Sequence, residues 1–197
     1  RKGPGMLWQS CAEKVIQKGG TICMGEKVVG LERIDEQWQV ISENEAGDRN
    51  TYQADHVISS AAIRDLAETL TPALSEKAAQ SAAALRYRDF ITVAVIVKDT
   101  EEFSDQWIYI HEPNVQVGRI QNFKSWSPDM VPDKALTCYG LEYFCFAREE
   151  GLWAMADEKL EELAISELCQ LGLARKADFV EAKVVRQRKA YPVYDEH

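Results

Sequence analysis

The chain has 197 residues, 46% of them hydrophobic, which is enough to bury a core as one large domain or two small ones. It carries 32 Asp and Glu against 23 Lys and Arg, a formal net charge of -9. An acidic surface repels phosphate backbones over most of its area, so we expect no nucleic-acid partner. No run of the sequence approaches the roughly 20 apolar residues that cross a bilayer, so no transmembrane segment is expected.

The cysteines indicate a reducing, cytoplasmic location. They form no CxxC pair and have no histidine at metal-ligand spacing, so we interpret them as small buried hydrophobic residues and expect no metal site. The sequence begins without a secretory signal and without methionine, and it stops within an apparent loop, so both ends are expected to be cut. The five positions are Cys11, Cys23, Cys138, Cys145 and Cys169.

The first third of the chain predicts a helix followed by a small strand meander. Apolar residues recur at helical spacing over residues 6–18, and Gly19 then ends the helix. Short β-rich stretches separated by turn residues follow at residues 27–34, 37–43 and 51–53.

Residues 54–61 form an apolar stretch that runs into small residues, which predicts a strand buried on both faces. Two helices are expected next, at residues 64–70 and 75–85, with Ser75 placed to cap the second. Small side chains at the end of the strand would let a ligand come close to the main chain.

The rest of the chain predicts a sheet with one long helix. Residues 118–130 are too polar for a core strand and too aromatic for an ordinary linker, so we expect them to carry function. Asp157 is placed to cap the last helix, which Gly172 ends. Strands are expected at residues 89–98, 106–111, 135–146 and 180–186.

Three linked segments carry a family resemblance. Taken in order and at this spacing, they resemble the central portion of the flavin-dependent amine oxidase superfamily, which includes protoporphyrinogen oxidase and, more distantly, UDP-galactopyranose mutase. The resemblance implies FAD as the cofactor of the intact protein. The segments are Gly3-Pro4-Gly5-Met6-Leu7, Gly19-Gly20 with Ile22, Gly25, Val28 and Leu31, and Ala54-Asp55 with Val57, Ile58 and Ser60.

The same resemblance implies which residues lie near FAD. Val28 matches a residue whose backbone contacts the adenine, and Ser59, Ser60 and Ala61 match the place where the chain passes the cofactor. Simple packing is the alternative for all four. None of the eleven glycines forms the Gly-x-Gly-x-x-Gly fingerprint that holds a dinucleotide pyrophosphate, so we expect this chain alone to bind FAD poorly and to be inactive.

A second stretch, residues 107–146, resembles the substrate domain of bacterial protoporphyrinogen-oxidase-like proteins. It implies no catalytic residue, but cations could pair with an anionic substrate and aromatic rings could stack on a flat or sugar-like one. The alternative is that the rings fill a sheet–helix interface and the cations face solvent. The candidate substrate-binding residues are Trp107, Tyr109, Arg119, Asn122, Lys124 and Tyr139.

Together these observations predict an α+β fold. Residues 1–61 would form part of an FAD-binding domain, and residues 62–197 a substrate-binding domain of mixed sheet and helices. The predicted function is oxidation of a small organic substrate by hydride transfer to FAD in the intact protein. A sugar-nucleotide mutase and a non-catalytic binding or assembly module stay open as alternatives. Apolar surface on helix 6–18 and strand 57–58 would favour self-association.

Overall fold

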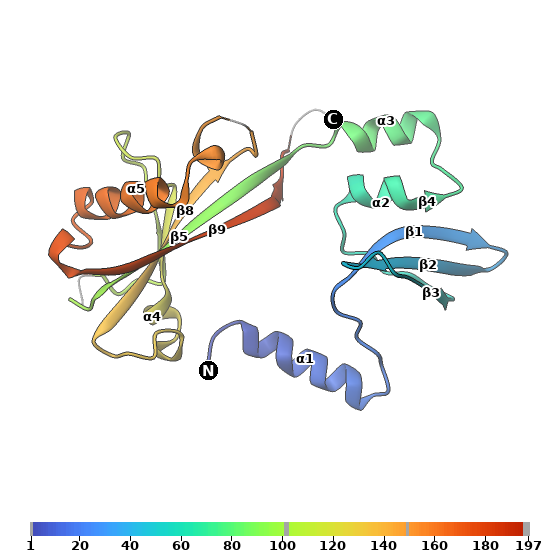
Figure 1. The fold of residues 1–197 in the computed structure, drawn as a ribbon, viewed down its shortest axis with the longest axis horizontal. Coiled ribbons are helices and arrows are strands. Elements are labelled where there is room, and N and C mark those ends of the chain that lie inside the picture. Colours follow the sequence, from blue (N-terminus) through green and yellow to red (C-terminus); the bar gives the residue numbers. More distant parts are fainter. Residues whose placement is uncertain (1, 101–102, 149, 195–197) are drawn as a thin grey trace. The chain divides into compact units, whose positions relative to one another are not determined.

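The computed structural model describes residues 2–100, 103–148 and 150–194, and it divides into two compact units (Figure 1). One unit, here the large-sheet unit, comprises Arg1–Glu13 and Tyr87–Pro192. The other, the small-sheet unit, comprises Lys14–Arg86 and Val193–His197. The sequence predicted a different division, at residue 61, between a cofactor-binding and a substrate-binding domain. That division is functional, and it stays a prediction.

The first third of the chain forms the predicted helix and meander. Helix α1 spans Gly5–Gln17, and Gly19 follows it with φ +85°, a conformation that glycine adopts without strain. The strands of the small sheet lie in the order β3-β2-β1-β4, with β4 parallel to β1 and the other pairs antiparallel. They are β1 Glu26–Ile34, β2 Gln37–Asn44, β3 Arg49–Ala54 and β4 Leu70–Thr71.

The strand predicted at residues 54–61 is wrong beyond Ala54. Residues 55–62 have no regular structure, and the Ile58 side chain is 99% exposed. A strand needs a neighbour to satisfy its backbone groups, and no strand of the described residues pairs with this segment. The two helices that follow are confirmed as α2 Ile63–Thr69 and α3 Glu76–Ala84, and the Ser75 hydroxyl accepts a hydrogen bond from the Ala78 N–H.

The large-sheet unit contains a five-stranded sheet in the order β6-β7-β8-β5-β9. Every pairing between these strands is antiparallel, whereas the sequence predicted a mixed sheet for this part of the chain. The parallel pairing of the described residues joins β1 and β4 in the small sheet. The α+β class itself is confirmed. The strands are β5 Tyr87–Lys98, β6 Trp107–Tyr109, β7 Arg119–Asn122, β8 Leu136–Cys145 and β9 Phe179–Pro192.

Helix α5, Asp157–Gln170, packs on one face of this sheet (Figure 1). From Asp89 to Val97, strand β5 alternates between buried and partly buried residues, because successive side chains of a strand point to opposite faces. Its buried residues join those of α5 in one hydrophobic core, and burial of that apolar surface is the main stabilisation of the unit. Core members include Ile91, Val93, Val95, Leu141, Leu160, Ala164 and Leu168.

A buried carboxylate connects α5 to the loop before β7. Glu167 is 4% exposed, and it accepts hydrogen bonds from the backbone N–H groups of Gln116 at 2.6 Å and Val117 at 3.2 Å. It also accepts one from the Tyr143 hydroxyl at 2.9 Å. Burial raises the pKa of Tyr143, and the neighbouring Glu167 raises it further, so Tyr143 stays protonated and keeps donating.

Two details of this unit differ from the sequence prediction. Residues 118–130 do contribute a core strand, β7, in which Ile120 is fully buried, and the short helices α4 Phe123–Trp126 and η1 Pro128–Met130 follow it. Asp157 does not cap α5: Ala156 occupies the N-cap position, and the Asp157 carboxylate accepts a hydrogen bond from Arg186 instead. The short helices η2 Leu152–Ala154 and η3 Lys176–Asp178 flank α5.

The helices of the described residues are too short or too polar to cross a membrane.

Candidate functional site

The face of the large sheet opposite α5, here called the open face, carries three of the predicted substrate residues. Strand register places Tyr109 opposite Arg119, and Arg119 opposite Glu142, across β6, β7 and β8. Trp107 lies opposite Gln121 in the same register. Since neighbouring strands present side chains at matching positions to one face, these residues form one continuous surface.

Arg119 and Glu142 form an ion pair at the centre of the open face. Arg119 Nε donates to one Glu142 oxygen, and the Gln121 side-chain amide donates to the other. Glu142 is 2% exposed, so this carboxylate is removed from water and is stabilised by its two partners. Partial burial lowers the pKa of Arg119, but hydrogen bonds and charge from Glu142 and Tyr191 raise it by more, and the guanidinium stays charged.

Aromatic rings surround the Arg119 guanidinium. Its Cζ atom lies 5.7 Å from the centroid of the Trp107 ring and 5.9 Å from the centroids of Tyr109 and Phe144. Trp107 and Tyr109 meet edge to face with centroids 4.9 Å apart. These distances suit cation–π contact. The site is therefore a planar cation that lies among aromatic rings, and Glu142 balances the charge of that cation. Such a surface can stack on a flat ligand.

A second aromatic group lies on β5, β8 and β9. The Phe90 and Phe144 rings are 5.3 Å apart, and Tyr191 stands 6.1 Å from Phe90 and 6.2 Å from Phe144. The Arg88 guanidinium lies over Phe144 at 5.3 Å. Sequence reasoning missed these four residues and Gln121, because they reach the site through strand pairing between distant segments, and only the register reveals it.

A pocket of about 460 Å³ opens beside Gln121. Phe123 lies against Gly140 of β8: a Cβ atom at Gly140 would come within 2.8 Å of the Phe123 ring, so only glycine permits this packing. No residue lining the pocket carries a charge, so it suits an apolar group. The lining residues are Gly3, Pro4, Gln121, Phe123, Trp126, Ser127 and Met130.

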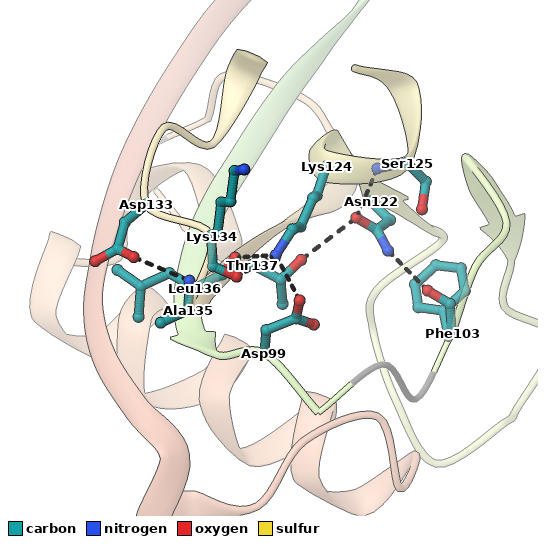
Figure 2. Close-up of polar contacts among 10 residues, drawn as sticks. All are labelled: Asp99, Phe103, Asn122, Lys124, Ser125, Asp133, Lys134, Ala135, Leu136 and Thr137. Carbon is teal, nitrogen blue, oxygen red and sulfur yellow. Dashed lines mark hydrogen bonds and ion pairs between the residues drawn. The ribbon is translucent and has the colours of Figure 1, made fainter. Parts of the chain in front are cut away.

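Three predicted substrate residues lie elsewhere. Lys124 donates to Asp99 and to the carbonyl oxygens of Lys134 at 2.7 Å and Leu136 at 2.9 Å (Figure 2). Tyr139 is buried in the core face, stacked on Phe103 at 5.4 Å. The structure therefore does not bring Lys124 or Tyr139 together with Arg119.

Asn122 is likewise turned away from the open face. It is buried, its side-chain nitrogen donates to the Phe103 carbonyl at 2.8 Å, and its oxygen accepts from the Ser125 N–H at 3.2 Å (Figure 2). In this arrangement Asn122 caps α4 and fixes the turn that leads from β7 to the pocket.

The predicted cofactor residues all lie in the small-sheet unit. Val28 is 44% exposed on β1, and no strand of the described residues pairs with the outer edge of β1 before Leu31. The small residues Ser59, Ser60 and Ala61 are exposed in an irregular segment. An open strand edge and an uncluttered main chain fit the approach of an adenine ring, which needs backbone hydrogen bonds and little side-chain bulk. The described residues hold no cluster of three or more metal-ligating side chains.

Comparisons with known proteins identify the family and the fold. A sequence model of the family described as flavin containing amine oxidoreductase matches residues 1–192. No curated protein matches the chain. Among solved structures, reduced UDP-galactopyranose mutase superposes with a TM-score of 0.74 at 19% identity, over 98% of this chain and 40% of its own.

Two further structures are similar. One is a protein of Exiguobacterium sp. whose description suggests protoporphyrinogen oxidase, with a TM-score of 0.69 at 14% identity over 94% of this chain and 40% of its own. The other is an oxidoreductase from Methanosarcina mazei, with a TM-score of 0.62 at 14% identity over 90% of this chain and 41% of its own. At these identities the likeness concerns the fold, and the chain spans about 40% of the length of these proteins.

Proposed function

Because the chain belongs to the flavin-containing amine oxidoreductase family, we propose that it is part of an FAD-dependent oxidoreductase whose substrate site is walled by the open face. The observation that carries this proposal is the charge-balanced Arg119–Glu142 pair among the rings of Trp107, Tyr109 and Phe144. A structural ion pair would not need three rings around it on the face of the sheet that α5 leaves free.

Within this function the residues of the open face bind and orient. Trp107 and Tyr109 stack on a flat part of a small organic substrate. Glu142 accepts a hydrogen bond from Arg119 and so holds the guanidinium against these two rings, which keeps them in position. The pocket beside Gln121 takes an apolar part of the same molecule and excludes water from it. FAD, when bound, would supply the redox chemistry by accepting a hydride from a C–H bond of the substrate, while a proton leaves the adjacent nitrogen or carbon and the C–N or C–C bond becomes a double bond.

On the cofactor side, we propose that the Val28 backbone contacts the adenine and that Ser59, Ser60 and Ala61 border the path of FAD. The open edge of β1 and the exposure of the small residues support these assignments. The reaction thus depends on residues of both units, each acting through its own surface.

The test is carried out on the intact protein that contains this chain. It is purified with and without added FAD, its visible absorption is recorded, and binding of a planar probe, benzyl alcohol, is titrated. We expect a yellow protein, and we expect Trp107→Ala to weaken the probe about fivefold, the loss of one aromatic contact. Trp38→Ala is the control, because Trp38 also stacks on an arginine, at 5.4 Å, but on β2. A protein that stays colourless with FAD would overturn the proposal.

A mutase function has one observation in its favour. Arg88, Arg119, Tyr109 and Tyr191 gather on the open face, as an anionic sugar nucleotide would require. The two reactions differ in net electron transfer. Anaerobic bleaching of the oxidised flavin by the substrate identifies the oxidoreductase, whereas turnover that requires reduced flavin and leaves it reduced identifies the mutase. A colourless protein that still binds the probe favours a non-catalytic binding module.

A further inference from the structure

The open face carries Arg119 and Arg88, and within the described ranges an acidic side chain pairs with Arg119 alone of the two. Arg119 is paired with Glu142, whereas Arg88 makes no hydrogen bond or ion pair with any described residue. Arg88 is exposed, and its guanidinium is held over the Phe144 ring at 5.3 Å. Stacking on a ring leaves the N–H groups at the rim of the guanidinium free to donate.

The neighbouring carboxylate does not cancel this charge. Asp89 follows Arg88 in the chain, but successive residues of a strand point to opposite faces. The Asp89 oxygens accept hydrogen bonds from the backbone N–H groups of Ala147 at 2.5 Å and Lys189 at 2.9 Å. Among the described residues Arg88 therefore presents a cation that no carboxylate compensates, on the open face of a chain whose formal net charge is -9.

The surroundings of Arg88 specify what would bind it. Tyr191 lies directly opposite Arg88 in the β5–β9 register and is 43% exposed. Phe90, Phe144 and Tyr191 form a ring cluster beside the guanidinium. A guanidinium binds a carboxylate or phosphate through two parallel N–H donors, and the adjacent rings bind a planar body.

We propose that Arg88 binds the anionic group, a carboxylate or a phosphate, of a substrate whose planar part stacks on Phe144 and Tyr191. This inference rests on the proposed function, since it places the anion on the same open face. Arg88 is thereby a specificity-determining residue, and Arg119, already neutralised, is a positioning residue for the rings. An acidic protein that takes an anionic substrate needs such a local cation to offset repulsion.

The experiment measures dissociation constants on the intact protein by isothermal titration with three probes of one shape. Benzoate and phenyl phosphate carry the two candidate anions, and benzamide is neutral. We expect the better anion to bind at least about tenfold more tightly than benzamide, and Arg88→Gln to remove this preference. Arg88→Lys keeps the positive charge but loses the two parallel N–H donors, so this variant should retain part of the preference for the anion.

Arg188→Gln is the matched control, because Arg188 also lies over a ring, Trp153 at 5.6 Å, but Trp153 packs against the core cluster. The preference for the anion should survive this change. Equal binding of benzamide and both anions by the unaltered protein, or an anion preference that Arg88→Gln leaves intact, overturns the inference. If Arg88→Gln leaves the anion preference intact but Trp107→Ala weakens binding of the probes, the proposed function stands and only the role of Arg88 is wrong. If neither Arg88→Gln nor Trp107→Ala changes binding, the proposed function is overturned as well.

Discussion

Arg119 of β7 and Glu142 of β8 lie directly opposite each other, and the arginine donates through Nε to a carboxylate that is almost fully buried. The pair is held on one side by Gln121 and is surrounded by aromatic rings. The charge balance of this pair leaves the centre of the open face planar and nearly neutral, whereas Arg88 is a cation that pairs with no acidic side chain in the described part of the chain.

Replacing Glu142 by Gln should destabilise the large-sheet unit. The change removes the charge that compensates Arg119 and sets the new amide against the Gln121 amide, so we expect the free energy of unfolding to fall by about 2 kcal/mol. Urea denaturation of the full chain measures it. Glu162→Gln is the control, because Glu162 pairs with Lys159 on an exposed helix surface and should cost less than about 0.5 kcal/mol. Equal effects of the two changes would show that the Glu142 pair contributes no more than a surface ion pair.

Lys124→Met should lower stability without weakening ligands of the open face. Lys124 donates to Asp99 and to two carbonyl oxygens, and its loss leaves Asp99 largely buried with one partner fewer (Figure 2). We expect a loss of about 2 kcal/mol in urea denaturation. In the intact protein the dissociation constant of benzoate should stay within about twofold, since a change of that size is under 0.5 kcal/mol. A tenfold weaker benzoate would instead make Lys124 a substrate ligand, as its charge predicted from the sequence.

The sequence predicted the elements that depend on local pattern. Gly19 ends α1, Ser75 caps α3, and the alternation of Ile91, Val93 and Val95 marks a strand with one face in the core. These features follow from backbone conformation and side-chain period, which act over a few residues.

What the sequence could not predict depends on pairing between distant segments. Residues 55–61 look like part of a buried strand, but strand formation needs a partner, and the described chain supplies none for them. Arg88 joins the site only because β5 lies between β8 and β9, which brings it to Phe144 and Tyr191. Lys124 looks like a free cation in the sequence, but the turn before β8 and the first residue of that strand bring two carbonyl oxygens to it. No local pattern carries that information.

The cysteines should separate by reactivity toward a thiol reagent such as DTNB. Burial raises the pKa of Cys138 to about 11, and it also raises the pKa of Cys145. Since the thiolate is the nucleophile, the rate at Cys138 should be very low at pH 8 and rise about tenfold for each pH unit until the pH reaches that pKa. Cys11 and Cys23 are exposed, so the prediction that the cysteines are buried is wrong for these two, and they should react first.

Mass spectrometry of the labelled chain identifies which cysteines react, and Cys138→Ala is the control that assigns the slow phase. Rapid labelling of Cys138 at pH 8 in the folded chain would contradict the prediction, because it would require far more thiolate than the raised pKa permits. Labelling in urea should remove the difference, since an unfolded thiol returns to its ordinary pKa of about 8.5.

Introducing a bulky side chain at Ser60 should reduce the FAD content of the intact protein. Ser60 is small and exposed, and the proposed path of the cofactor passes beside it, so Ser60→Trp would occupy the space that the ligand needs. Ala46→Trp is the matched control, because Ala46 is also small and exposed but lies in the turn between β2 and β3. The ratio of absorbance at about 450 nm to that at 280 nm, after correction for the added tryptophan, measures bound flavin. We expect Ser60→Trp to lower this ratio at least twofold and Ala46→Trp to leave it unchanged. If both variants keep a full complement of FAD, Ser60 does not border the cofactor, and its exposure reflects only a segment without a pairing partner.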